Sequence, residues 1–111
     1  EQQLGPGITE ALARSAALAR ADADFLDELA AAAAADLVGP GLEVEAVAAL
    51  PTPIATRVLQ SWLRESGAVD VTAVHVQAVW ALVVDWHGQV GVDLPGARIS
   101  RVGGRLHADR L

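Results

Sequence analysis

The stretch WHGQVGVDLPGARISRVGGRL, from Trp86 to Leu106, decides the fold because a helical pattern ends there and strand and turn signals take over. Trp86 closes an apolar helix, and Gly88 can adopt the positive φ of a helix C-terminus. Apolar residues then alternate through Val90–Leu94, which is the period of a half-buried strand. Pro95-Gly96 is typical of a tight turn, since Pro fixes φ at its second position and Gly supplies positive φ at its third.

The residues after this turn predict two further strands and form the one clearly basic segment of the chain. The first strand is Ala97–Val102, and a break at Gly103-Gly104 permits a short third strand over Arg105–His107. The sequence therefore predicts a small antiparallel meander at the end of a helix. The tail of this meander carries three arginines with no acid among them, and these are Arg98, Arg101 and Arg105.

The N-terminal third of the chain predicts one long helix. It follows a break at Gly5-Pro6-Gly7, opens at Thr9 and runs to about Val38, roughly 45 Å if unbroken. Asp22 falls inside its apolar stripe, where a polar side chain is expected to need a partner. Because the stripe is mostly alanine, a neighbouring helix can approach closely. Its members are Ile8, Leu12, Ala19, Ala23, Leu26, Ala30, Ala33 and Leu37.

Breaks rich in proline and glycine set off the next two elements. Gly39-Pro40-Gly41 ends the long helix, and Leu42–Ala46 alternates apolar residues with two glutamates, as expected of a short strand that partners the meander. Thr52 is then expected to N-cap a helix over Pro53–Ser66, with its proline in the first turn.

That second helix has a polar face worth naming. Arg57, Gln60 and Arg64 stack on it at three- and four-residue spacing. Two interpretations stay open: a solvated face of a mostly buried helix, or a row that contacts phosphates.

A third helix is capped by Asp70 or Thr72 and runs to Trp86. It is nearly apolar all round, so we expect it to be the central and most buried helix. His75 lies on its apolar side and is interpreted as a hydrogen-bonded core residue rather than a ligand or base. His87 is interpreted as a turn residue.

The composition indicates one helix-rich α+β domain. Its 111 residues suffice for a core, and we divide them into the long helix at 1–38, a strand with two helices at 42–88 and the β-meander at 89–111. The absence of Cys excludes disulfides, thiolate zinc sites and thiol catalysis, and fits a cytoplasmic protein. No membrane span or signal peptide is apparent, and a start without Met suggests a fragment of a longer chain.

The net charge of −6 is divided unevenly along the chain. Residues 1–50 hold nine acids against two arginines, whereas residues 51–111 hold five acids against six arginines. An anionic partner is therefore expected to meet the C-terminal half.

No catalytic constellation is present. The sequence has no GxSxG, no Walker-type loop, no GxGxxG after a strand and no HExxH, and three scattered histidines without Cys argue against zinc. We therefore expect no catalytic residue, metal or cofactor in this chain, and an independent small enzyme is the least favoured interpretation.

Three blocks, in order, resemble the bacterial tRNA(Ile)-lysidine synthetases, particularly the actinobacterial kind. They are ALARSAALARADADFLDELA at 11–30, ALPTPIATRVLQSWLRESG at 49–67, and HVQAVWALVVDWHGQ at 75–89 with VDLPG and the arginine tail behind it. Each block is weak alone, but the ordered set covers most of the chain.

The resemblance implies an ATP-dependent tRNA-modifying ligase as the parent enzyme. In the family, an N-terminal ATP-pyrophosphatase domain with a Ser-Gly-Gly loop uses ATP and magnesium to adenylate the wobble cytidine of isoleucine tRNA, and lysine then displaces AMP to give lysidine. The Ser-Gly-Gly loop is absent here, so the chain resembles the C-terminal substrate-binding region.

Two functions from different classes follow. The first is a non-catalytic tRNA-positioning domain, whose partners are isoleucine tRNA and its own N-terminal catalytic domain. Its candidate contacts to the tRNA backbone are Arg57, Arg64, Arg98, Arg101 and Arg105. The alternative is a dimerisation or inter-domain scaffold module without direct tRNA contact, in which the Ala-rich helix packs on its counterpart in a homodimer.

Overall fold

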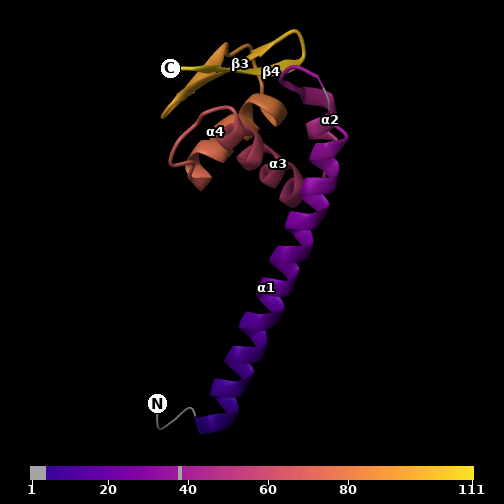
Figure 1. Ribbon diagram of the computed structural model, residues 1–111, viewed down its shortest axis with the longest axis vertical. Coiled ribbons are helices and arrows are strands. Elements are labelled where there is room, and N and C mark those ends of the chain that lie inside the picture. The colour runs from indigo at the N-terminus through magenta and orange to yellow at the C-terminus, as the bar shows by residue number, and fades with distance from the viewer. Residues whose placement is uncertain (1–4, 38) are drawn as a thin grey trace.

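The computed structural model describes residues 5–37 and 39–111, and it confirms a helix-rich α+β fold with a long N-terminal helix and a C-terminal antiparallel sheet (Figure 1). One end of the long helix joins a body in which the sheet lies across the shorter helices. The elements in chain order are α1 Gly5–Ala35, β1 Leu42–Glu43, α2 Val44–Ala48, α3 Thr52–Glu65, α4 Ala73–Val84, β2 Gly91–Leu94, β3 Ala97–Val102 and β4 Arg105–Arg110.

The four strands are ordered β1-β4-β3-β2, and every pairing is antiparallel. The predicted meander is confirmed, and β1 pairs with β4 as expected, with Leu42 opposite Leu106. The strand predicted over Leu42–Ala46 is wrong after Glu43, because the chain turns there into α2. One helical turn buries both Val44 and Val47, which an extended strand could not place on the same face.

Helix α1 extends further toward the N-terminus than the sequence predicted. Gly5-Pro6-Gly7 lies in its first turn rather than forming a break, since proline is tolerated where the backbone N–H has no helical partner. The last helical residue is Ala35, and the predicted end at Val38 lies outside the described residues.

Only the C-terminal half of α1 packs on the body. Ala30 is buried there, and the alanine seam allows a close approach to α3, as expected. Ile8 and Leu12, on the same predicted stripe, are 45% and 62% exposed because the N-terminal half projects beyond the body (Figure 1). Asp22 is exposed as well, so the expectation that it needs a polar partner is wrong. The radius of gyration of 17.7 Å exceeds the roughly 13 Å of a compact domain this size because of this projection.

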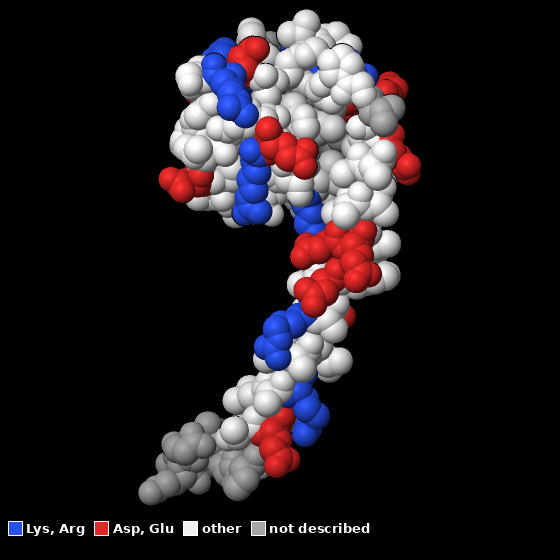
Figure 2. All heavy atoms as spheres, in the orientation of Figure 1, with Lys and Arg blue, Asp and Glu red and all other residues white. Residues whose placement is uncertain are grey.

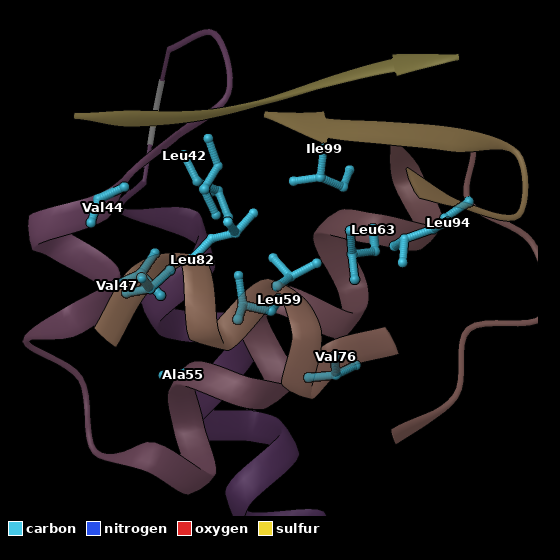
Figure 3. Packing of buried hydrophobic residues seen from close by; sticks show 14 of the residues in the cluster. Leu42, Val44, Val47, Ala55, Leu59, Leu63, Val76, Leu82, Leu94 and Ile99 are labelled. Carbon is cyan, nitrogen blue, oxygen red and sulfur yellow. The ribbon is translucent and has the colours of Figure 1, made fainter. Parts of the chain in front are cut away.

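Two apolar clusters hold the body together. The larger one lies between the sheet and helices α2, α3 and α4, with Leu59, Leu63 and Ile99 among its fully buried side chains (Figure 3). The smaller one joins α1 to α3 through Ala30, Ile54 and Val58. The sheet therefore has one face on the helices.

The helix ends show which predicted caps form. Thr52 is the first residue of α3, whose N-cap is Pro51, so the Thr52 cap is wrong. At α4, Thr72 rather than Asp70 is the cap. The Thr72 N–H donates to Nδ1 of His75 at 3.0 Å, and the His75 N–H donates to Oγ1 of Thr72 at 3.4 Å. The predicted hydrogen bonding of His75 is thus confirmed, as one half of a capping box, but its predicted place in the core is wrong because the side chain is only half-buried in the first turn of α4.

Helix α4 is shorter and less enclosed than predicted. It ends at Val84, and Trp86 lies in the loop that follows. Val76 and Val79 are buried against the rest of the body, but Val74 is 76% exposed and Val84 is 54% exposed. A helix that is nearly apolar all round thus has one side that faces solvent. In the described part of the chain, no helix has the length and apolarity needed to cross a membrane.

Candidate nucleic-acid interface

The polar face of α3 borders a groove between that helix and α1. Arg57 and Arg64 stand two turns apart on α3, with Gln60 between them, and alanines of α1 form the opposite wall. The groove has a volume of about 400 Å³. Its lining residues are Asp27, Ala30, Ala31, Ala34, Arg57, Gln60, Ser61, Arg64 and Glu65. The two arginines that the sequence placed in one row thus share one concave surface.

Arg57 already has partners within the fold. Its Nε donates to Oδ1 of Asp27 on α1 at 2.9 Å, and its Nη1 donates to the carbonyl oxygen of Pro53 at 2.9 Å. Its side chain is 30% exposed and that of Asp27 is 67% exposed. This ion pair ties α1 to α3 and offsets part of the positive charge in the groove.

Arg64 lies in the last turn of α3 and is exposed. Within the described residues its side chain forms no ion pair and donates no hydrogen bond. A cation in that position interacts favourably with the helix dipole. Arg64 therefore presents the least neutralised of the five predicted contact groups.

Arg98 and Arg105 lie on the face of the sheet that points away from the helices. Strand alternation places them opposite Asp109 and Val102, while Ile99 and Leu106 point into the core. Nη1 of Arg98 is 2.7 Å from Oδ1 of Asp93 on β2.

Arg105 ties β4 to the segment that precedes β1. Its Nε donates to the carbonyl oxygen of Pro40 at 2.9 Å, and its Nη1 lies 3.9 Å from Oε2 of Glu43. Both outward-facing arginines, Arg98 and Arg105, thus have an acid close by.

Arg101 points to the opposite side of the sheet, where its side chain joins β3 to α4. Its Nη1 donates to the carbonyl oxygens of Leu82 at 2.7 Å and Val83 at 3.4 Å, in the last turn of α4. Its guanidinium carbon lies 4.1 Å from the ring centroid of Trp86. The side chain therefore satisfies carbonyls that the helix end leaves without partners.

The five predicted contact residues do not form one cluster. Arg57 and Arg64 share the α1–α3 groove, whereas Arg98 and Arg105 lie on the outer face of the sheet and Arg101 points to its helix-facing side. Figure 2 shows acidic side chains gathered on α1 where it leaves the body, with basic side chains close by on the body and further along the helix. The surface is thus mixed in charge rather than uniformly basic.

Sequence reasoning missed most of the residues that hold these arginines. The Asp93–Arg98 pair could have been found, because a two-residue turn at Pro95-Gly96 places them directly opposite each other. Asp27 is thirty positions before Arg57, and no local pattern connects them.

The charged side chains of the described residues all lie at least partly exposed at the surface. These residues contain no group of three or more His, Asp or Glu side chains arranged to hold a metal ion. The arrangement is one of hydrogen-bond donors and cations at a surface, which suits recognition of an anionic chain.

Comparison with known proteins gives a consistent assignment. The family model described as the TilS substrate binding domain matches residues 42–107, which span the elements from β1 to β4 and leave out α1. The tRNA(Ile)-lysidine synthase of Thermobifida fusca is 50% identical over 106 residues, covering 91% of this chain and 32% of that protein.

Other relatives extend the similarity into α1. The tRNA(Ile)-lysidine synthase of Leifsonia xyli is 41% identical over 112 residues, covering 96% of this chain and 34% of that protein. The corresponding protein of Rhodococcus erythropolis is 45% identical over 97 residues, covering 86% of this chain and 30% of that protein. The chain thus spans about a third of the length of these curated relatives. On this evidence the chain belongs to the TilS substrate-binding domain family.

Proposed function

We propose that this chain is the tRNA-binding part of a longer, ATP-dependent tRNA(Ile)-lysidine synthase, and that it holds isoleucine tRNA while the wobble cytidine is converted to lysidine elsewhere in the enzyme. The family assignment and the names of the relatives support this, as does the chain's coverage of only about a third of their length. ATP and magnesium would bind in the catalytic domain of the parent, which acts in the cytoplasm and carries this domain as its C-terminal region.

The observation that carries the proposal is the groove in which Arg57 and Arg64 stand seven residues apart on one helix face. A guanidinium group can donate two parallel hydrogen bonds to a phosphate, and Gln60 and Ser61 add neutral donors between the two cations. Such contacts fix the position of a nucleic acid backbone without reading its bases.

Binding at this groove involves competition with Asp27. The Asp27 carboxylate forms an exposed ion pair with Arg57, and exposed pairs of this kind contribute about 1 kcal/mol or less to stability. A phosphate can therefore displace the carboxylate at small cost, whereas Arg64 is available without any displacement. Arg98 and Arg105 would add contacts at the outer face of the sheet by the same exchange.

A salt titration of tRNA binding tests the proposal. Isoleucine tRNA and an unrelated tRNA would each be titrated with the 111-residue chain at several salt concentrations. Affinity should fall steeply as salt rises, because phosphate contacts release counterions. A cognate preference would add recognition of tRNA shape, and no binding to either tRNA at low salt would overturn the proposal for this chain.

One observation favours the alternative of a dimerisation or scaffold module. The part of α1 that carries Leu12, Leu18 and Phe25 exposes large apolar side chains at 62%, 67% and 58%. Leu18, Phe25 and Leu29 follow one another at seven- and four-residue spacing, which places them on one stripe.

Sedimentation of the 111-residue chain over a range of concentrations separates the two functions. A homodimer through α1 should show a mass that rises with concentration and that falls to the monomer value in a Phe25→Glu variant. A concentration-independent monomer would count against self-association.

A further inference from the structure

The loop Asp85–Gln89 that follows α4 is fixed by its own hydrogen bonds. The Trp86 Nε1–H donates to the carbonyl oxygen of Gln89 at 2.8 Å, and the His87 N–H donates to Oε1 of Gln89 at 2.7 Å. The Gln89 side chain in turn donates to the carbonyl oxygen of Asp85 at 3.4 Å, and Nδ1 of His87 lies 3.1 Å from the same oxygen. Four contacts within five residues hold the loop and orient the indole.

Trp86 remains 46% exposed although its ring is held in place. One face of the ring lies against the guanidinium of Arg101, at 4.1 Å, and that guanidinium is anchored to the carbonyl oxygen of Leu82. The indole N–H is already satisfied inside the loop. The exposed part of the indole is therefore apolar ring surface that needs no hydrogen-bond partner.

Further exposed apolar side chains stand close to the ring in the chain. The Arg101 N–H donates to the carbonyl oxygen of Val90 at 3.0 Å, which places Val90 beside Arg101 on the same side of the sheet. Val90 is 67% exposed, and Val84, two residues before Trp86, is 54% exposed. Trp86 thus presents an exposed ring that its own loop holds in place, with a cation against one face and exposed apolar residues on either side of it in the chain.

We propose that Trp86 is a stacking platform for an unpaired nucleobase of RNA, with His87 beside it as a polar contact. This inference rests on the proposed function, since it assigns part of the tRNA to this surface. Unpaired bases in RNA loops are commonly stacked on aromatic side chains and arginine planes. A ring that is already immobile loses little conformational entropy when a base stacks on it.

The cation beneath the ring favours a base over an apolar protein segment. The face of an aromatic ring carries negative charge, and the Arg101 guanidinium offsets part of it, which lets a second π-system approach face to face. The same charge attracts the phosphates that flank any nucleobase. An apolar protein segment would use neither property.

Binding of two RNAs to the 111-residue chain tests this platform. The first RNA is the anticodon stem-loop of isoleucine tRNA, and the second is a duplex of the same stem without unpaired nucleotides. Trp86→Leu should weaken stem-loop binding about tenfold and leave duplex binding unchanged, because only the stacked base is lost. Trp86→Phe keeps an aromatic face and should stay within about threefold of the unmodified chain. Val74→Ala, at the far end of α4, is the matched control for loss of an exposed apolar side chain.

A measurement on the unmodified sequence decides the question if Trp86→Leu fails to fold. Incorporation of 5-fluorotryptophan gives one ¹⁹F resonance for each of the three tryptophans. The Trp86 resonance should shift on addition of the stem-loop and stay in place with the duplex. The proposed stacking platform would be overturned if the Trp86 resonance did not shift on addition of the stem-loop, or if it shifted only when the protein self-associates.

The two proposals fail in different ways. If the chain binds isoleucine tRNA with steep salt dependence but Trp86→Leu binds the stem-loop like the unmodified chain, only the platform is overturned. If neither RNA nor the complete tRNA binds, both proposals are overturned.

Discussion

Arg101 on β3 donates a hydrogen bond of 2.7 Å to the carbonyl oxygen of Leu82 in the last turn of α4. The last carbonyls of a helix have no partner within it, and the guanidinium supplies one while its plane lies against Trp86. A residue that the sequence placed among the candidate tRNA contacts therefore also joins the sheet to the helix beneath it. Its influence on RNA binding would be exerted through the position of Trp86 and through the positive charge against the ring.

Arg101→Ala should lower the free energy of unfolding by about 1.5 to 3 kcal/mol, the range for hydrogen bonds that involve a charged group. Arg101→Lys keeps the charge but cannot span two carbonyls and a ring in the same way, so an intermediate loss is expected. Urea denaturation followed by circular dichroism measures both. Arg98→Ala is the control, because its exposed ion pair with Asp93 should contribute about 1 kcal/mol or less. Equal stability of the Arg101→Ala and Arg98→Ala variants would contradict this role.

The fold class and the meander could be predicted because their signals are local. The turn at Pro95-Gly96 sets the register of β2 and β3, and the break at Gly103-Gly104 sets that of β3 and β4. Helix ends were harder to place. Trp86 follows the apolar run at 78–84 with only Asp85 between them, so nothing in the sequence alone shows that the helix stops at Val84 and that the ring turns back onto Arg101.

The sequence predicted which arginines belong to the candidate site but not which acids pair with them. The spacing of Arg57 and Arg64 was enough to place both on one face of α3. Asp27 lies thirty positions before Arg57 in the chain, and only the packing of α1 on α3 brings the two together. Contacts of that kind depend on how two helices cross, and a single sequence does not encode the crossing in any local pattern.

Thr72→Ala should lower the free energy of unfolding by about 1 kcal/mol, since it removes one half of the capping box with His75. Asp70, the other residue that the sequence offered as a cap, has a φ of 51°. Asp70→Gly should therefore leave stability unchanged or raise it slightly, because glycine adopts that conformation without strain. Thermal unfolding of the two variants side by side measures the difference. A greater loss of stability in Asp70→Gly than in Thr72→Ala would contradict the assignment of the cap to Thr72.

Gly41→Ala should destabilise the chain by about 2 kcal/mol or more. The φ of Gly41 is 71°, and a Cβ there would collide with the main-chain carbonyl of Leu106 on β4, which cannot move without breaking the sheet. Gly103→Ala is the matched control, because its φ of 61° is also left-handed but its Cβ would meet open space. That variant should lose only the conformational cost of about 1 kcal/mol. Chemical denaturation of both would show whether the close approach beside β1 matters beyond backbone strain.

Arg64→Glu should weaken binding of isoleucine tRNA severalfold and reduce the dependence of affinity on salt by about one phosphate contact. Arg64 is exposed at the groove and forms no ion pair among the described residues. Replacement of its side chain should therefore leave the fold intact. Arg14→Glu makes the same charge change on the projecting half of α1, away from the groove. Fluorescence anisotropy with labelled tRNA at several salt concentrations measures both variants. An equal effect of the two would show that net charge alone governs binding, and would remove the α1–α3 groove as the place where the backbone is held.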